Sequence, residues 1–341
     1  MERNGFSDTE SNLNNNSDDA LDRQDFKDNI DELQFLVREY RKTEHFRKML
    51  DFISKCNWLA PYNAMLVEMQ LPGAFMVMNG SDWKKFNRRP KPNARRLVTL
   101  MSFGPVQFMF DYGDTELIPG LEDVPVIKMM EEMDQSLNKT EGDAPDEYFD
   151  QLLSNMAQLG IFVDDKFEAA NTYGGYIMPY SEAKIKITLT KDTYLIYDSA
   201  FIISINRKES NSSKFHTLCH ELGHLFCRHQ WYDPSERRRG TLSEREFEAE
   251  TVAWLVCKRL KIKNPSEEYL AGYTQNGEVP ICSTDAILKA VKKIEDLMKG
   301  PLHIKASPWY EKNKSLKELV NRAMPKKKHP VQMTLPGMEN I

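Results

Sequence analysis

The segment Phe215-His-Thr-Leu-Cys-His-Glu-Leu-Gly-His-Leu-Phe226 contains the pattern H-E-x-x-H at residues 220–224. Its apolar residues recur at helical spacing, so we expect an amphipathic helix packed against a core. The two histidines lie one turn apart on the same face and can reach one metal ion. Glu221 follows the first histidine, and in this motif it takes a proton from a water molecule that zinc activates. The segment therefore predicts a Zn²⁺ site with His220 and His224 as ligands and Glu221 as the catalytic base.

The third ligand has to come from another part of the chain, because a catalytic zinc ion usually has three protein ligands and one open position. The next helix, expected from about Ser243, carries carboxylates at Glu246, Glu248 and Glu250. Ser243 and Glu246 have the spacing of a capping box, which would occupy Glu246 at the helix start. Glu248 shares a face with apolar residues, where an unpaired carboxylate would be costly without a cation. Periodicity does not exclude Glu250, so the residues alone leave Glu248 and Glu250 open.

Composition limits the broad class of the protein. The chain has 341 residues, enough for two domains, with 40% hydrophobic and 28% charged residues, which is typical of soluble globular proteins. Its net charge of -5 argues against a uniformly basic nucleic-acid binder. The five cysteines have no C-x-x-C spacing, which indicates reduced thiols. The polar start has no signal-peptide pattern, and no apolar run approaches the length of a membrane span, so we predict a cytoplasmic protein without a membrane contact.

The order of sequence patterns predicts an α+β protein with two domains. Residues 1–24 are polar and Asn-rich, which indicates a disordered tail. Helical runs followed by short strand-like runs predict a small α+β domain over 25–114, and an acidic connector with one short helix is expected over 115–146. Residues 147–323 form the predicted metal domain, in which an alternating strand at 184–190 and a strand at 201–205 precede the motif helix and a mostly helical C-terminal part. A flexible basic tail is expected over 324–341.

A basic patch is the second chemical feature of the sequence. No acidic residue occurs between Trp83 and Phe110, and cationic residues crowd near aromatic ones. Cations can neutralise phosphates and aromatic faces can stack on unpaired bases, although a solvated strand edge would have the same composition. The predicted nucleic-acid-binding residues are Trp83, Lys84, Lys85, Arg88, Arg89, Lys91, Arg95 and Arg96.

The metal motif resembles a known family. Thr217-Leu-Cys-His-Glu-Leu-Gly-His224, followed by Glu246-x-Glu248-Ala-Glu250-x-x-Ala253, is similar to the ImmA/IrrE metallopeptidases. The resemblance implies a zincin-like domain of the gluzincin type, with Glu248, the glutamate before the alanine, as the third ligand. It also implies cleavage of a regulatory or DNA-associated protein, such as a transcriptional repressor. The sequence departs from the family at Glu250, where Asn or Asp is usual, and at His216, which is either a neighbour of the site or a surface residue.

The N-terminal part resembles a second family. Tyr62-Asn-Ala-Met-Leu66, Trp83 and Arg88-Arg-Pro-Lys-Pro-Asn-Ala94 look like the N-terminal domain of ArdC-type antirestriction proteins. In those proteins a domain that binds single-stranded DNA precedes a zincin domain, so the resemblance implies that the basic patch binds single-stranded DNA. Pro92-Asn93 replaces the usual Lys-Gly pair of that loop.

Two functions follow from these patterns. The first is an intracellular zinc-dependent metalloendopeptidase with an N-terminal nucleic-acid-binding domain. The alternative is an antirestriction or single-stranded-DNA-binding protein whose zinc domain is structural or only weakly hydrolytic. A structural zinc site is usually closed by four ligands, and the three good candidates here favour catalysis. A minor feature, Gln332-Met-Thr-Leu-Pro336, resembles peptides that dock on bacterial sliding clamps and predicts such a contact.

Overall fold

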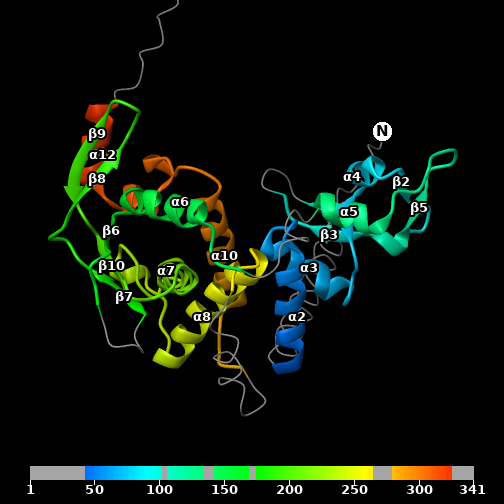
Figure 1. Ribbon diagram of the computed structural model, residues 1–341, viewed down its shortest axis with the longest axis horizontal. Helices are drawn as coiled ribbons and strands as arrows, with labels where there is room; N and C mark the ends of the chain where they lie inside the picture. The colour runs from blue at the N-terminus through cyan, green and yellow to red at the C-terminus, as the bar shows by residue number, and fades with distance from the viewer. Residues whose placement is uncertain (1–42, 102–105, 134–141, 169–173, 264–278, 325–341) are drawn as a thin grey trace, which may run out of the picture.

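The computed structural model describes residues 43–101, 106–133, 142–168, 174–263 and 279–324, and it has the α+β character expected from the sequence (Figure 1). The predicted tail at 1–24, nearly all of the tail at 324–341 and the clamp-like segment at 332–336 lie outside these residues. Figure 1 shows two lobes, with α2, α3, α8 and α10 gathered between them. Among the described helices, none combines the length and the apolar character that crossing a membrane requires.

The smaller lobe is built from short strands and helices. A three-stranded antiparallel sheet has the order β1-β4-β3, with Val77 opposite Asp111 and Val98 opposite Phe108. A separate antiparallel pair joins β2 to β5, with Arg89 opposite Glu116. The elements of this part of the chain are α2 (Thr43–Lys55), α3 (Pro61–Gln70), β1 (Val77–Asn79), α4 (Gly80–Lys85), β2 (Arg88–Pro90), β3 (Leu97–Thr99), β4 (Gln107–Asp111), η1 (Tyr112–Asp114), β5 (Thr115–Leu117) and α5 (Val126–Met133).

The acidic segment after residue 114 is not a connector over most of its length. Residues 115–117 form β5, which pairs with β2. Helix α5 buries Met129 in a small hydrophobic cluster with Met76 and Trp83. The expected short helix corresponds to α5, but the prediction of a connector is wrong for 115–133, because β5 and α5 pack as part of the small lobe.

The larger lobe contains the metal motif. Its sheet has the order β6-β10-β7, with β10 parallel to β6 and antiparallel to β7. The alternating segment forms β8, which pairs with β9 and buries Ile185 and Ile187 while its other residues face solvent. The elements are α6 (Asp146–Met156), η2 (Ala157–Leu159), β6 (Ile161–Asp164), β7 (Gly175–Pro179), β8 (Lys184–Thr188), β9 (Tyr194–Asp198), β10 (Phe201–Ile205), α7 (Asn211–Phe226), η3 (Pro234–Glu236), α8 (Leu242–Arg259), α10 (Thr284–Met298), η4 (Ile304–Ala306), α11 (Pro308–Lys312) and α12 (Lys314–Ala323).

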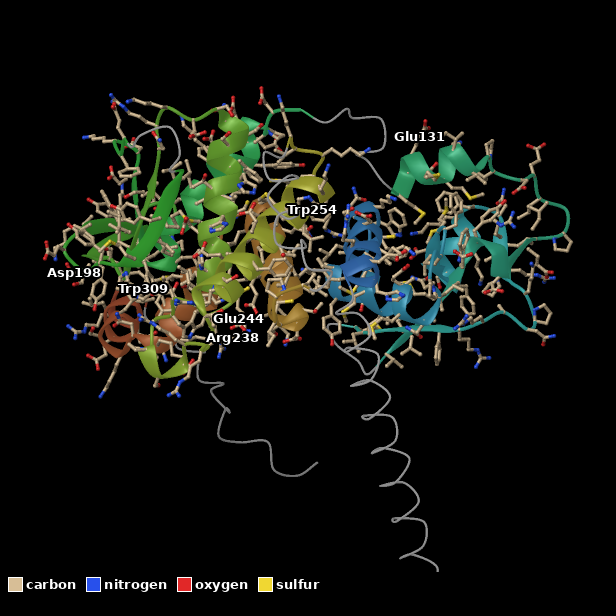
Figure 2. The ribbon with its side chains drawn as sticks, turned by 90° about the horizontal axis from the view of Figure 1, so that it is seen from below. Glu131, Asp198, Arg238, Glu244, Trp254 and Trp309 are labelled. Carbon is tan, nitrogen blue, oxygen red and sulfur yellow. The ribbon has the colours of Figure 1, made fainter. Side chains whose placement is uncertain are left out.

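One hydrophobic core crosses the predicted boundary between the two domains. Apolar residues of α2 and α3 belong to the same cluster as those of α7, α8 and α10, and the rings of Phe46 and Phe247 lie 5.9 Å apart. In Figure 2, Trp254 of α8 lies between the two lobes. Helices α2 and α3 therefore pack as part of the larger core, although their sequence precedes the small sheet.

Arg259, the last residue of α8, links α8 to the end of α2 and to α10. Its guanidinium is buried and donates to the backbone carbonyls of Ile53, Cys56 and Leu59, at 2.8, 3.0 and 2.9 Å. The same group pairs with Glu295 of α10, with Nε 2.5 Å from a carboxylate oxygen. The carbonyl of Ile53 lies in the last turn of α2, where helix carbonyls lack intrahelical partners, so a buried cation from a distant helix satisfies it.

Candidate metal centre

Two helices position the candidate metal ligands. Helix α7 begins at Ser210, whose side chain accepts the N–H of Ser213, and it buries an apolar face against the core. Helix α8 begins with a capping box formed by Thr241 and Glu244. The sequence-based capping box of Ser243 and Glu246 is therefore wrong by two residues. The carboxylate of Glu246 is free of the cap and points from the second turn of α8 toward α7.

Three ligand atoms meet at the crossing of these helices. His220 Nε2 and His224 Nε2 are 3.1 Å apart, and Glu246 Oε2 lies 3.4 Å from the first and 3.5 Å from the second. Atoms held about 2.0–2.2 Å from a tetrahedral zinc ion stand roughly 3.3–3.6 Å from one another. The triangle of these atoms therefore fits one zinc ion with little adjustment, and the ligand types are those that zinc prefers.

The structure does not bring Glu248, the predicted third ligand, to the two histidines of the motif. Its Oε2 lies 2.8 Å from His229 Nε2, and Arg238 donates to both carboxylate oxygens, at 2.6 and 2.8 Å. The carboxylate does point inward, as its helical face required, but its cation is a guanidinium. The prediction of Glu248 as the third ligand is therefore wrong. Its buried position reflects the ion pair with Arg238 and not a contact with a metal ion.

Glu250, the other candidate, contacts the outer side of the site. Its carboxylate lies 2.8 Å from His220 Nδ1 and 3.2 Å from His216 Nε2. Burial opposes its ionisation, but the two histidines outweigh burial and lower its pKa. Glu250 thus holds the ring of His220 by its far nitrogen, a position that fixes the tautomer and orientation of a ligand imidazole. His216 is a buried neighbour of the site and not a surface residue.

Glu221 lies beside the triangle in a nearly dry position. Its side chain is 6% exposed, and it accepts a backbone hydrogen bond from Ile177 of β7. Burial raises the pKa of Glu221 to about 7; His220 opposes this rise and Glu246 adds to it. A carboxylate with a pKa near neutrality can both take and return a proton at neutral pH.

A cavity of about 620 Å³ opens onto these groups. Edge strand β7 forms one wall, and α7 and the start of α8 form the others. Gln230 Oε1 and Arg245 Nε are buried in this wall and have no hydrogen-bond partner among the described residues. Leaving such atoms unpaired is costly for the folded protein.

The predicted nucleic-acid patch is divided by the fold. Trp83 is fully buried and donates from Nε1 to the carbonyl of Phe110 at 2.9 Å. Arg88 is also buried; its Nε donates to Thr115 Oγ1 at 2.9 Å and its Nη1 to Asp123 at 3.1 Å. These two residues serve the core of the small lobe, so their prediction as nucleic-acid contacts is wrong. Trp83 stands among cations in the sequence, but its ring is buried in the hydrophobic cluster beneath α4 and cannot stack on a base.

The remaining patch residues lie at the surface, and most have partners. Lys85 pairs with Asp82, Arg89 with Glu116, and Lys91 and Arg95 donate to backbone carbonyls. Lys84 is exposed. The guanidinium of Arg96 lies over the ring of Phe108, 5.7 Å from its centroid. Phe108 belongs to an exposed apolar face of β3 and β4 that the sequence did not single out; we call it the open sheet face, and it consists of Val98, Leu100, Val106 and Phe108.

No protein-family model matches the sequence, and no curated protein matches it either. Among solved structures, the chain is similar to the crystal structure of metal-free antirestriction protein ArdC from the R388 plasmid. The two share 14% identity, the match covers 74% of this chain and 95% of that chain, and the TM-score is 0.31. A similarity of this size carries no weight for the site, whose chemistry follows from its own geometry.

Sequence reasoning missed several groups around the centre. Glu246 had a recoverable signal, because Thr241-x-x-Glu244 is a second capping box two residues earlier. His229 and Arg238 had none: both lie in the segment after α7, and only the folded chain brings them to Glu248. The edge strand β7 was also not predicted.

Proposed function

We propose that this protein is a zinc-dependent metallopeptidase with a zincin-like domain, in which His220, His224 and Glu246 bind the ion and Glu221 is the catalytic base. The observation that carries the proposal is the triangle of two imidazole nitrogens and one carboxylate oxygen, with sides of 3.1, 3.4 and 3.5 Å. Glu221 stands beside it in the same cavity. A three-ligand site that opens to a cavity is typical of catalytic zinc, whereas structural zinc is usually closed by a fourth ligand.

The chain's own residues divide the chemical work. Zinc, when bound, supplies Lewis-acid activation of a water molecule and of a carbonyl group. Glu221 accepts the proton of the attacking water and returns it to the leaving amine, and its raised pKa suits both transfers. The N–H of Ile177 holds the Glu221 carboxylate in place. Glu250 orients His220 from outside.

The edge of β7 favours an extended peptide as substrate. Tyr176 and Met178 pair with Ser204 and Ile202 of β10, and the flanking bonds from Asn206 N–H to Gly174 and from Tyr180 N–H to Ala200 show which residues face β10. The backbone groups of Gly175, Ile177 and Pro179 therefore point to the other side, where β7 has no strand partner among the described residues. The Ile177 N–H is taken by Glu221 and proline has no N–H, so this edge offers a peptide the Gly175 N–H and the three carbonyl groups. An extended chain can add to such an edge by main-chain hydrogen bonds.

Metal analysis and cleavage assays test the proposal together. We expect one zinc ion per chain in the wild-type protein, none in Glu246→Gln, and one in Glu221→Gln. A peptide library made by digesting a proteome, incubated with wild-type protein and read by mass spectrometry, should contain new cleavage products that are missing with Glu221→Gln. Zinc retention by Glu246→Gln would overturn the ligand set. Equal cleavage by the wild-type and Glu221→Gln proteins would overturn the catalytic assignment and leave the structural-zinc alternative.

A second function, binding of single-stranded DNA, is favoured by the open sheet face. Phe108 is 46% exposed and carries the Arg96 guanidinium over its ring, so an aromatic surface and a cation occur together. Bases stack on exposed aromatic rings, and phosphates are neutralised by nearby cations. We propose the open sheet face with Arg96 as the binding surface, in place of the patch that the sequence predicted around Trp83.

Titration of a labelled oligonucleotide at several salt concentrations tests this second function. Phe108→Ala should weaken binding at every salt concentration with little change in salt dependence. Arg96→Ala should weaken binding and reduce the log-log salt slope by about 0.7, the value for one phosphate contact on a single strand. Arg89→Ala is the matched control, because Arg89 is already paired with Glu116. Absence of binding by the wild-type protein at low salt would remove this function. The regulatory protein substrate, the cytoplasmic location and the clamp contact stay predictions.

A further inference from the structure

A third histidine stands behind one of the two histidines of the motif. His224 Nδ1 lies 3.0 Å from His229 Nδ1, and the two ring centroids are 5.1 Å apart. His229 is 4% exposed and comes just after the end of α7. A buried imidazole at this distance fixes the far side of His224, in the way that Glu250 fixes the far side of His220.

The protons of this chain of groups have one consistent arrangement. If His224 Nε2 binds the ion, its proton is on Nδ1 and is donated to His229 Nδ1. His229 must then carry its own proton on Nε2, which lies 2.8 Å from Glu248 Oε2 and donates to it. Each nitrogen thus has one role, and an imidazole held in this way cannot turn without breaking two hydrogen bonds.

Glu248 is the last group of the hydrogen-bonded series His224–His229–Glu248, and several contacts hold it in place. Besides His229, it accepts both arms of the Arg238 guanidinium and the backbone N–H of Ser283 at 2.6 Å. Burial opposes the ionisation of Glu248, but the hydrogen bonds from His229 and Arg238 outweigh it and lower its pKa. Arg238 also donates to the carbonyl of Cys227 at 3.2 Å. The anchor therefore joins the segment after α7 to the residue that caps α10.

The same neighbourhood allows another interpretation, a second metal site. Cys227, His229 and Glu248 place ligand atoms within 4.8 Å of one another, and all three are buried. However, Arg238 already neutralises Glu248 through a bidentate contact, and burial raises the pKa of the Cys227 thiol well above its usual range. A metal ligand would have to be a thiolate beside an unpaired carboxylate. The contacts therefore favour a hydrogen-bonded anchor over a second ion.

We infer that His229 is a positioning residue for the metal ligand His224 and that Glu248 and Arg238 act through it, so that the zinc affinity depends on a salt bridge outside the ligand set. This inference rests on the proposed zinc site. The two histidines of the motif are then oriented by different groups. His220 is held by Glu250 of α8. His224 is held by His229, which is linked through Glu248 to Arg238 in the loop before α8. Arg238 lies in that loop, between η3 and α8, and is labelled in Figure 2.

Zinc competition with a chromophoric chelator tests the inference in the full-length chain. Loss of a group that orients a metal-bound histidine typically lowers metal affinity about 10–100-fold. We expect a loss of this size for His229→Leu and Glu248→Gln, and a smaller loss for Arg238→Ala. The last variant guards against misfolding, because the Arg238 side chain is 34% exposed and Glu248 keeps its hydrogen bonds from His229 and the Ser283 N–H. The visible absorption spectrum of the cobalt-substituted protein should also change, because the geometry around His224 relaxes.

Glu236→Gln is the matched control, since Glu236 lies in the same loop but contacts Trp231 and Lys312 instead. It should keep both the affinity and the spectrum. If the wild-type protein binds no zinc, the proposed function fails, and with it the site. If the wild-type protein binds zinc, Glu246→Gln does not, and Arg238→Ala and Glu248→Gln both bind as tightly as wild type with an unchanged cobalt spectrum, the positioning role is overturned while the metal site stands.

Discussion

Gly175, the first residue of β7, sits at the closest backbone approach next to the candidate site. A Cβ atom at this position would lie 2.3 Å from the carbonyl oxygen of Ser204 and 2.8 Å from Thr217 Cγ2. We expect Gly175→Ala to push β7 away from β10 and α7, with a loss of stability of about 1–3 kcal/mol. Because β7 carries the Ile177 N–H that holds Glu221, peptidase activity should fall while zinc affinity, which depends on α7 and α8, changes little.

Gly300→Ala is the control for this prediction, because a Cβ atom there meets nothing within 4 Å. Denaturant unfolding, zinc titration and cleavage assays on the two variants distinguish a local clash from a general effect of losing a glycine. Equal behaviour of both variants would show that β7 tolerates the extra atom and that its position is not set by close packing.

The candidate ligands show how far single residues could be predicted. The spacing of His220, Glu221 and His224 placed all three at one helical site, because a helix fixes neighbours four residues apart. The third carboxylate depended on where α8 begins, and an error of two residues gave the cap to Glu246 in place of Glu244. Periodicity also predicts that Glu248 points inward. It does not predict that Arg238 is the partner of Glu248, because Arg238 comes from a loop with no periodic pattern.

Among the elements, α8 depends most on a single side chain at its end. Arg259→Met would remove the cation that pairs with Glu295 and the side-chain donor to the carbonyl of Ile53 in α2. Removing one partner of a buried ion pair typically costs about 3–5 kcal/mol. We expect a loss of this size in denaturant unfolding, whereas Lys289→Met, which breaks an exposed pair with Asp285, should cost less than about 1 kcal/mol. Similar losses for both variants would contradict the role of Arg259.

Helix α3 gives a prediction with a pH dependence. Glu68 is buried and accepts the N–H of Gly73 at 3.0 Å; burial raises its pKa, and this hydrogen bond offsets only part of the rise. A folded-state pKa above the unfolded value of about 4.3 means that stability falls as the pH rises and Glu68 ionises. Glu68→Gln keeps an acceptor and removes the titration.

We therefore expect the Glu68→Gln protein to be more stable than the wild type at about pH 7–8, with the difference vanishing near pH 4. Thermal unfolding of both proteins across this range measures the effect. A constant difference at every pH would mean that the substitution acts through packing and not through the charge of Glu68.

Elements with strong periodicity were predictable and short elements were not. The alternating residues of β8 gave both the strand and its buried side, as Ile185 and Ile187 confirm. Within 115–133 the sequence predicts one short helix but not β5 or the packing of α5 on the small lobe, because acidic residues dominate the composition of this stretch. The acidic composition reflects the residues of this stretch that face solvent. Whether it forms a strand depends on β2, which lies more than twenty residues earlier in the sequence.

At the scale of the whole molecule, the shared core predicts that the two lobes cannot be separated at residue 114. A fragment ending there would lose β5 and α5 and expose the faces of α2 and α3 that pack on the larger lobe. Even fragment 43–133, which keeps β5 and α5, leaves those faces of α2 and α3 uncovered. We expect it to be largely unfolded or aggregated, as measured by circular dichroism and size-exclusion chromatography. A monomeric, cooperatively folded fragment would contradict this, and DNA binding should accordingly be measured on the full chain.

The contacts of Arg259 also imply a delay during synthesis on the ribosome, because α2 is made long before Arg259. The hydrogen bond from Arg259 to Ile53 spans 206 residues of sequence. At elongation rates of about 5–20 residues per second, α2 emerges roughly 10–40 s before the arginine that caps it. During that interval the nascent chain presents Phe46, Met49 and Ile53 without their partners. Helix α2 is thus synthesised long before its packing partners, and chaperones that shield apolar segments are expected to bind it in the meantime.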